Sequence, residues 1–129
     1  MDNKNYTILF VEDESDIRTL YCDYLTGEGF NVIQAEDGGE GLDKIFNQHW
    51  DLLMLDIMLP IEDGMSLLTK VREDQNLSGK PVIMFTNLSK EDVAAKGYQA
   101  GADSYMIKSQ ITPDMLLSEV KRLLEKGNN

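Results

Sequence analysis

The chain has 129 residues, 42% hydrophobic and 27% charged, which is the length and composition of one globular domain spanning residues 1–129. Twelve basic against 23 acidic residues give a net charge of −11, which argues against nucleic acid or an anionic membrane surface as a partner. One cysteine, no zinc-ligand spacing, a polar start after Met1 and no apolar run approaching about 20 residues predict a reduced, cytoplasmic protein without a membrane span.

Short apolar runs alternate with stretches of helical spacing in the first half of the chain. The run 8–11 predicts a strand, and the helix after it ends at Gly27 or Gly29. The second strand is expected over 30–35, and a second helix separates it from a third strand over 50–55. The first helix should bury one stripe, made of Ile17, Leu20, Tyr21, Tyr24 and Leu25.

The same alternation continues to the end of the chain. Asp63 and the following glycine begin the third helix. Ser89 has capping-box spacing for a weak fourth helix that contains Gly97. Thr112 is the expected N-cap of a last helix that ends near 126, before a frayed tail at 127–129. The remaining two strands are the apolar runs 82–85 and 105–107.

Five strands alternating with five helices predict an α/β fold, a doubly wound five-stranded parallel sheet covered by helices on both faces. Burial on both faces explains why the strands are continuous apolar runs. With right-handed crossovers, we expect the strand order 2-1-3-4-5, which places strands one and three side by side at the switch point. Glu12, Asp13 and Asp56 would meet there, at the carboxyl ends of these two strands.

Residues that can handle a phosphoryl group follow four of the five strands. Carboxylates bind a hard divalent cation, a hydroxyl and an amine contact an anion, and one carboxylate can act as a nucleophile. Three carboxylates in one pocket repel each other, so without metal at least one pKa should rise. Each residue alone is better explained as a cap, a turn hydroxyl or a solvated lysine. The hypothesis rests on the whole set, which is Glu12, Asp13, Asp56, Thr86 and Lys108.

Over the whole chain, this set and the segments around it resemble the receiver domain of two-component response regulators, the CheY-like branch of the flavodoxin-like folds. The segments that match are Asp56-Ile-Met-Leu-Pro60 and Asp63-Gly64. The resemblance implies transfer of a phosphoryl group to Asp56 from a sensor histidine kinase, a phosphotransfer protein or a small acyl phosphate. It implies a phosphoacceptor switch that assists its own phosphorylation and dephosphorylation, and no turnover enzyme.

The resemblance also implies a role for each site residue. Mg²⁺ would be bound by Asp13, Asp56 and the backbone carbonyl of Met58, with Glu12 reached through water. Lys108 would pair with a phosphoryl oxygen.

Two further residues would form the switch. The Thr86 hydroxyl would donate a hydrogen bond to the phosphoryl group, and Tyr105 would then fill the space that Thr86 vacates. A downstream protein would contact the face made by the helix 89–100, strand five and the final helix. The output is expected to be this protein contact, or an effector on a segment outside the present sequence.

Two residues depart from the usual pattern of the family. Lys108 is normally followed by proline, whereas here Ser109 follows, so we expect a trans peptide between them. The residue after Thr86 is commonly small, whereas here it is Asn87, which would narrow access to the phosphorylated aspartate.

Three other functions remain open from the sequence. An enzyme of the haloacid dehalogenase type needs a second aspartate two residues after the first, where this chain has Met58. A nucleotide-binding flavodoxin-like module needs a glycine-rich loop after strand one, where this chain has the acidic segment 12–15. A receiver-like domain that never accepts phosphate is disfavoured because every expected position is intact.

Overall fold

The computed structural model describes residues 3–127, which contain one five-stranded parallel sheet in the order β2-β1-β3-β4-β5. The strands are β1 (Thr7–Val11), β2 (Asn31–Ala35), β3 (Leu52–Leu55), β4 (Val82–Thr86) and β5 (Ser104–Ile107). Both the fold class and the strand order predicted from the sequence are confirmed.

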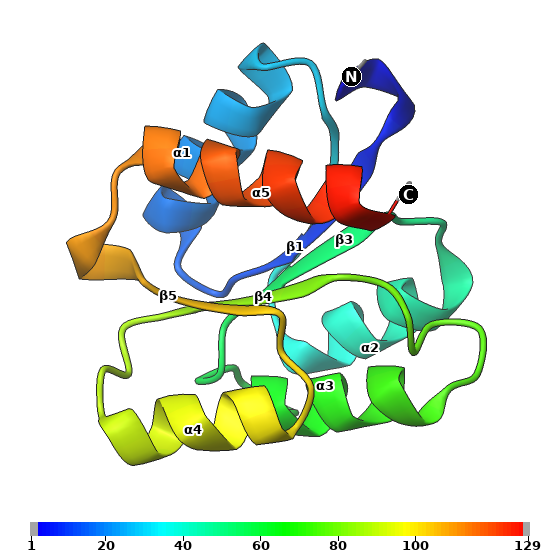
Figure 1. The fold of residues 1–129 in the computed structure, drawn as a ribbon, viewed down its shortest axis with the longest axis vertical. Helices are drawn as coiled ribbons and strands as arrows, with labels where there is room; N and C mark the ends of the chain where they lie inside the picture. The colour runs from blue at the N-terminus through cyan, green and yellow to red at the C-terminus, as the bar shows by residue number, and fades with distance from the viewer. Residues whose placement is uncertain (1–2, 128–129) are drawn as a thin grey trace.

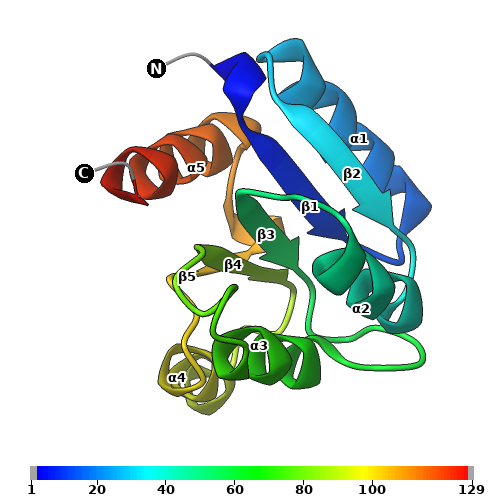
Figure 2. The ribbon, with the colours of Figure 1, turned by 90° about the vertical axis from the view of Figure 1, so that its right-hand side faces the viewer.

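Helices cover both faces of this sheet. The helices are α1 (Ser15–Gly27), α2 (Gly38–Asn47), α3 (Gly64–Glu73), α4 (Glu91–Gln99) and α5 (Pro113–Gly127), with the 3₁₀ turns η1 (Asn3–Asn5) and η2 (Lys108–Gln110). In Figures 1 and 2, α1 and α5 lie on one face, and α2, α3 and α4 lie on the other. Each face has its own apolar core, with Leu25 and Val120 in one and Leu67 and Val71 in the other.

The burial of the strands explains their sequence pattern. Every residue of β3 and β4 is buried, which requires the continuous apolar runs seen in both. At the edge of the sheet, β2 exposes Asn31 and Gln34.

The register of the parallel pairs fixes which residues meet at the carboxyl end of the sheet. Val11 pairs with Leu55, so the residues that follow them, Glu12 and Asp56, are level with each other. On the other side, Thr86 pairs with Ile107. Lys108 is the next residue in the chain, so it lies immediately beyond the last paired residues of β4 and β5.

At the amino end of the sheet, one arginine ties two loops together. The Arg72 guanidinium donates to the carbonyl oxygens of Ser78 and Lys80 at 3.1 and 2.7 Å, and to that of Gly101 at 2.9 Å. It also forms an ion pair of 2.9 Å with Asp103. The turn after α4 is therefore held by α3, and Gly101 can take part because its φ of +108° suits glycine.

Several predicted boundaries are wrong by one or two residues. β2 begins at Asn31, because the Phe30 N–H donates to the carbonyl oxygen of Leu25 and not to a neighbouring strand, and β3 begins at Leu52, where its register with β1 begins. The expected cap Ser89 lies outside α4, whose N-cap is Lys90, and no side chain among the described residues caps that turn. α5 begins after Thr112 as predicted and extends to Gly127, while the rest of the expected frayed tail, 128–129, lies outside the described residues.

The predicted stripe of α1 is partly wrong. Leu20 is 54% exposed, whereas Arg18 and Cys22 are buried beside Tyr21 and Leu25. These four positions also have helical spacing. A pattern based on apolar residues alone does not include the arginine. The predicted buried face is therefore shifted by about one residue from the observed one.

The loop between β3 and α3 contains a strained turn. Ile61 has a φ of +75°, and the N–H of Glu62 donates to the carbonyl oxygen of Pro60 at 2.9 Å, which closes a three-residue γ-turn. A positive φ is costly for a β-branched residue, and the Ile61 side chain is 81% exposed. Packing therefore offsets little of the strain.

We predict that Ile61→Gly stabilises the fold. Relief of the positive φ is worth about 1–2 kcal/mol, and the added freedom of the unfolded chain removes about 0.4–1 kcal/mol of that. Urea unfolding should show a net gain of about 0.5–1 kcal/mol. Ile61→Ala keeps a Cβ atom at the same φ and is the matched control. Equal stability of the two variants would contradict the assigned strain.

Candidate functional site

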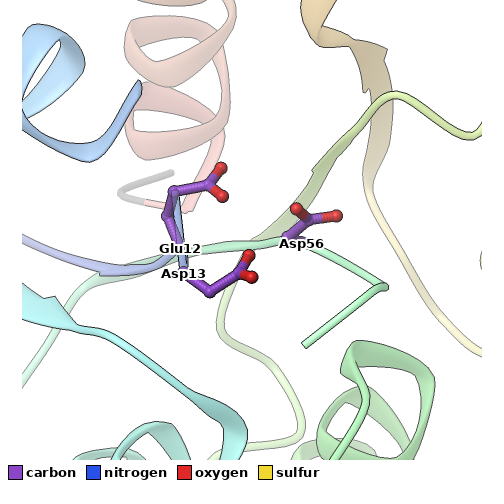
Figure 3. Close-up of side chains that lie close together, drawn as sticks. All are labelled: Glu12, Asp13 and Asp56. Atoms are coloured by element: carbon purple, nitrogen blue, oxygen red, sulfur yellow. The ribbon is translucent and has the colours of Figure 1, made fainter. Parts of the chain in front are cut away.

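Three carboxyl groups gather at the carboxyl ends of β1 and β3. Glu12 and Asp13 follow β1, and Asp56 follows β3. One oxygen from each group lies within 4.8 Å of the others, and Figure 3 shows the three side chains around a common space. Oxygen ligands at this spacing suit a hard cation such as Mg²⁺. The sequence predicted this cluster, and the register of the sheet produces it.

Lys108 reaches this cluster from the end of β5. Its ammonium nitrogen lies 2.7 Å from Asp56 Oδ2, to which it donates a hydrogen bond, and 2.5 Å from Glu12 Oε1, with which it forms an ion pair. The residue is buried. Burial alone would lower the pKa of Lys108, but its contacts with Asp56 and Glu12 raise the pKa above its ordinary value. The lysine is therefore a fixed positive charge in the site.

Glu12 is the most deeply buried carboxyl group of the three. Burial raises its pKa from 4.5 to about 7, even though Lys108 and the backbone N–H of Glu14 act in the opposite direction. The charge of Asp56 adds a smaller effect of the same sign as burial. The expected rise of one pKa is therefore found, and its main cause is loss of water rather than repulsion between carboxylates.

The cluster opens into a pocket of about 260 Å³. Its lining residues are Asp13, Glu14, Asp56, Met58, Thr86, Asn87, Leu88 and Lys108. The Met58 N–H donates to Asp56 Oδ1 at 3.3 Å, and its side chain is exposed at the mouth. The predicted site residues other than Glu12 and Tyr105 thus line one cavity, with Glu12 buried behind it.

Thr86 and Tyr105 are connected through the backbone of one residue, Leu88. The Thr86 hydroxyl oxygen accepts a hydrogen bond of 3.4 Å from the Leu88 N–H. The Tyr105 hydroxyl donates to the Leu88 carbonyl oxygen at 2.6 Å. The Tyr98 hydroxyl in turn accepts from the Tyr105 N–H at 3.1 Å, which ties α4 to β5. Side-chain patterns gave no sign of these links, since Leu88 contributes only its backbone.

Two residues position the site in ways that the sequence analysis did not assign to them. The buried guanidinium of Arg18 donates to the carbonyl oxygen of Glu12 at 2.7 Å and pairs with Glu36 at 3.3 Å, which fixes the turn that carries Glu12. Gly64, at the start of α3, packs against the backbone of Asp56, and a Cβ atom there would lie 2.0 Å from the Asp56 carbonyl oxygen. The sequence signal for Arg18 was its helical spacing with Tyr21.

The loop after Lys108 follows the predicted course. No peptide bond in the described part of the chain is cis, so the bond between Lys108 and Ser109 is trans. The Ser109 N–H donates to Asn87 Oδ1 at 3.1 Å across the mouth of the site.

A family model matches most of the chain. The model is that of the response regulator receiver domain, and it covers residues 8–121. Among curated proteins, the transcriptional regulatory protein ResD of Bacillus subtilis (strain 168) is 36% identical over 129 residues. The match covers 99% of this chain and 52% of ResD, so the chain spans about half the length of that relative.

Solved structures give the same fold. A CheY-like response regulator receiver domain protein from Methanospirillum hungatei JF-1 superposes with a TM-score of 0.88 at 33% identity, covering 95% of this chain and 96% of that one. The BeF3-activated DrrB receiver domain has a TM-score of 0.83 at 30% identity, covering 93% and 97% respectively. No helix in residues 3–127 is long and apolar enough to cross a membrane.

The raised pKa of Glu12 predicts a pH dependence of stability in metal-free protein. An acid whose pKa is higher in the fold than in the unfolded chain contributes most stability below pH 4.5, and this contribution is lost as the pH rises to about 7. The loss is at most about 3 kcal/mol.

Glu12→Gln removes this titration. Urea unfolding in a chelator, at several values between about pH 5 and pH 7.5, should show the wild type losing stability relative to the variant. Comparing the proteins at each pH cancels the groups they share. Parallel curves would mean that Glu12 does not titrate in this range.

Proposed function

This chain belongs to the response regulator receiver domain family, and we propose that it is a signalling switch controlled by phosphorylation of Asp56. The observation that carries the proposal is the position of Asp56, which lies in a cluster with two other carboxyl groups and accepts a hydrogen bond of 2.7 Å from the ammonium of Lys108. A nucleophile, a cation site and a fixed positive charge are thereby combined.

In the proposed reaction, an Asp56 carboxylate oxygen attacks phosphorus in a phosphohistidine or a small acyl phosphate. A bond forms between this oxygen and phosphorus, and the bond from phosphorus to the donor's nitrogen or oxygen breaks. The leaving group retains the electron pair of the broken bond, and the product is an aspartyl phosphate. The donor is a sensor histidine kinase, a phosphotransfer protein or a small molecule, and the chain itself is no turnover enzyme.

The carboxyl groups fit a magnesium ion. Asp13 and Asp56 would be direct ligands with the backbone carbonyl of Met58, and Glu12 would act through water. Their oxygens lie within 4.8 Å of one another, and Asp13 is exposed to incoming water and metal. When bound, the ion would draw negative charge from the phosphoryl group.

Lys108 and Thr86 would hold the transferred group. The Lys108 ammonium now contacts Asp56 Oδ2, and it would move to a phosphoryl oxygen while keeping its ion pair with Glu12. The Thr86 hydroxyl now accepts from the Leu88 N–H at a long 3.4 Å, which leaves its own proton available to a phosphoryl oxygen.

The switch would follow from this change at Thr86. Movement of its hydroxyl toward the phosphoryl group breaks the bond to Leu88, and Leu88 is also the partner of the Tyr105 hydroxyl. Tyr105 would then turn inward, and the change would reach a downstream protein at the face made by α4, β5 and α5. This domain would act in the cytoplasm, without contacting nucleic acid or a membrane.

The proposal is tested by phosphorylation with acetyl phosphate. We expect Mg²⁺ and acetyl phosphate to add one phosphoryl mass to the intact protein, because Asp56 is the nucleophile with both a cation site and Lys108 beside it. Mass spectrometry of the intact chain measures the addition. Asp56→Asn should remove it, while Asp51→Asn, at the opposite end of β3, is the matched control and should keep it. Labelling that survives Asp56→Asn would overturn the proposal.

The switch predicts an effect of Gly97 in α4. A Cβ atom at this position would lie 3.2 Å from Cδ2 of Tyr105, so alanine should displace the ring and weaken its hydrogen bond to Leu88. Alanine should also stabilise the helix by about 1 kcal/mol. We expect slower amide exchange in α4, together with shifted NMR signals of Tyr105 and Leu88.

Ala95→Gly, at an exposed position of the same helix, is the control for helix propensity alone. It should speed amide exchange in α4 and leave the signals of Tyr105 and Leu88 in place. Unchanged signals in Gly97→Ala would show that the helix absorbs the methyl group without moving the ring.

A further inference from the structure

The two loops that carry Thr86 and Lys108 are joined by one hydrogen bond beyond the end of the sheet. Asn87 follows Thr86, Ser109 follows Lys108, and the Ser109 N–H donates to Asn87 Oδ1 at 3.1 Å. Regular pairing of β4 with β5 ends at Thr86 and Ile107. The side chain of Asn87 therefore continues the connection between the two strands where their backbones no longer pair.

This bond depends on the residue types at both positions. A proline at 109 would have no N–H to donate, and a small apolar residue at 87 would have no acceptor. The bond also fixes the orientation of the Asn87 amide, because only its oxygen can accept from the Ser109 N–H. Both residues that depart from the usual receiver pattern are therefore partners in a single contact.

The bond holds the backbone on the far side of Lys108. On the near side, Ile107 belongs to the sheet, and on the far side Ser109 is held by Asn87. The ammonium end of Lys108 is held by Glu12 and Asp56, but its contact with Asp56 must be given up when a phosphoryl group arrives. Another contact must then keep the backbone around Lys108 in place.

We propose that Asn87 is a positioning residue for Lys108. Its hydrogen bond to Ser109 keeps the turn after β5 in place while the ammonium passes from Asp56 to a phosphoryl oxygen. Because Asn87 is also bonded along the chain to Thr86, the same contact keeps the two phosphoryl-binding residues at a fixed spacing. The inference rests on the proposed function, since it concerns the binding of a phosphoryl group at Asp56.

The test is the affinity for beryllofluoride, a phosphoryl analogue, at saturating Mg²⁺. Asn87→Ala should weaken this affinity by about three- to tenfold, the loss expected for one neutral hydrogen bond. The affinity for Mg²⁺ alone should stay unchanged, because Asn87 follows β4, which β3 separates from β1 and the Asp13 that follows it. In NMR spectra, the Ser109 amide proton should move upfield in the variant, which reports loss of the bond directly.

Matched variants separate the bond from the bulk of Asn87 at the pocket mouth. Ser109→Ala keeps the N–H and should bind beryllofluoride as the wild type does. Ser109→Pro removes the N–H but also restricts Lys108, so it is used as the background for Asn87→Ala. In that background, Asn87→Ala should have no further effect, because its partner is already gone.

The outcomes distinguish failure of the proposed function from failure of the inference about Asn87. If the wild type does not bind beryllofluoride, the proposed function itself is wrong. If the wild type binds and Asn87→Ala binds equally well, Asn87 does not position Lys108. If Asn87→Ala weakens binding equally with and without Ser109→Pro, its effect comes from the shape of the pocket mouth, and the inference is overturned.

Discussion

A buried ammonium shared by two buried carboxyl groups is the interaction on which the site depends. Lys108 lies 2.5 Å from Glu12 and 2.7 Å from Asp56, and each of the three comes from the end of a different strand. Loss of Lys108 would leave the buried carboxylates without a compensating charge, which costs about 3–5 kcal/mol. One ammonium cannot neutralise three carboxylates. The remaining charge of about −2 would be neutralised by a divalent cation beside Asp13 and Asp56 and halved by a proton on Glu12, so proton and metal should compete.

The sequence predicted the features that follow from chain geometry. Parallel strands present their carboxyl ends at one edge, so residues such as Asp56 and Lys108, 52 positions apart, could be placed together once the strands were recognised. Helix ends with a strong local signal were also predictable. Asp63 caps α3 through its side chain, and Thr112 does the same for α5.

The other features of the fold and the site could not be predicted, because they depend on tertiary contacts of atoms whose partners no sequence pattern indicates. Ser89 has the spacing of a cap, but the backbone turns into α4 one residue later. Arg18 is buried because its guanidinium donates a hydrogen bond to the carbonyl oxygen of Glu12. Hydrophobic periodicity does not indicate a hydrogen-bond partner of this kind. The backbone of Leu88 links Thr86 to Tyr105, and no side-chain rule assigns a role to a backbone amide.

The arginine contacts at the amino end of the sheet give α4 two unequal ends. Its last turn leads into Gly101 and Asp103, which Arg72 fastens to α3, while no side chain of the described residues caps its first turn. A displacement of Leu88 would therefore act on the uncapped start of α4, whose opposite end is held by Arg72. Nine helical residues are about 13 Å long, so a rotation of about 10° about the anchor would move the start of α4 by about 2 Å. The start of α4, beside the pocket, would then move farthest, and the end of the helix held by Arg72 would move least.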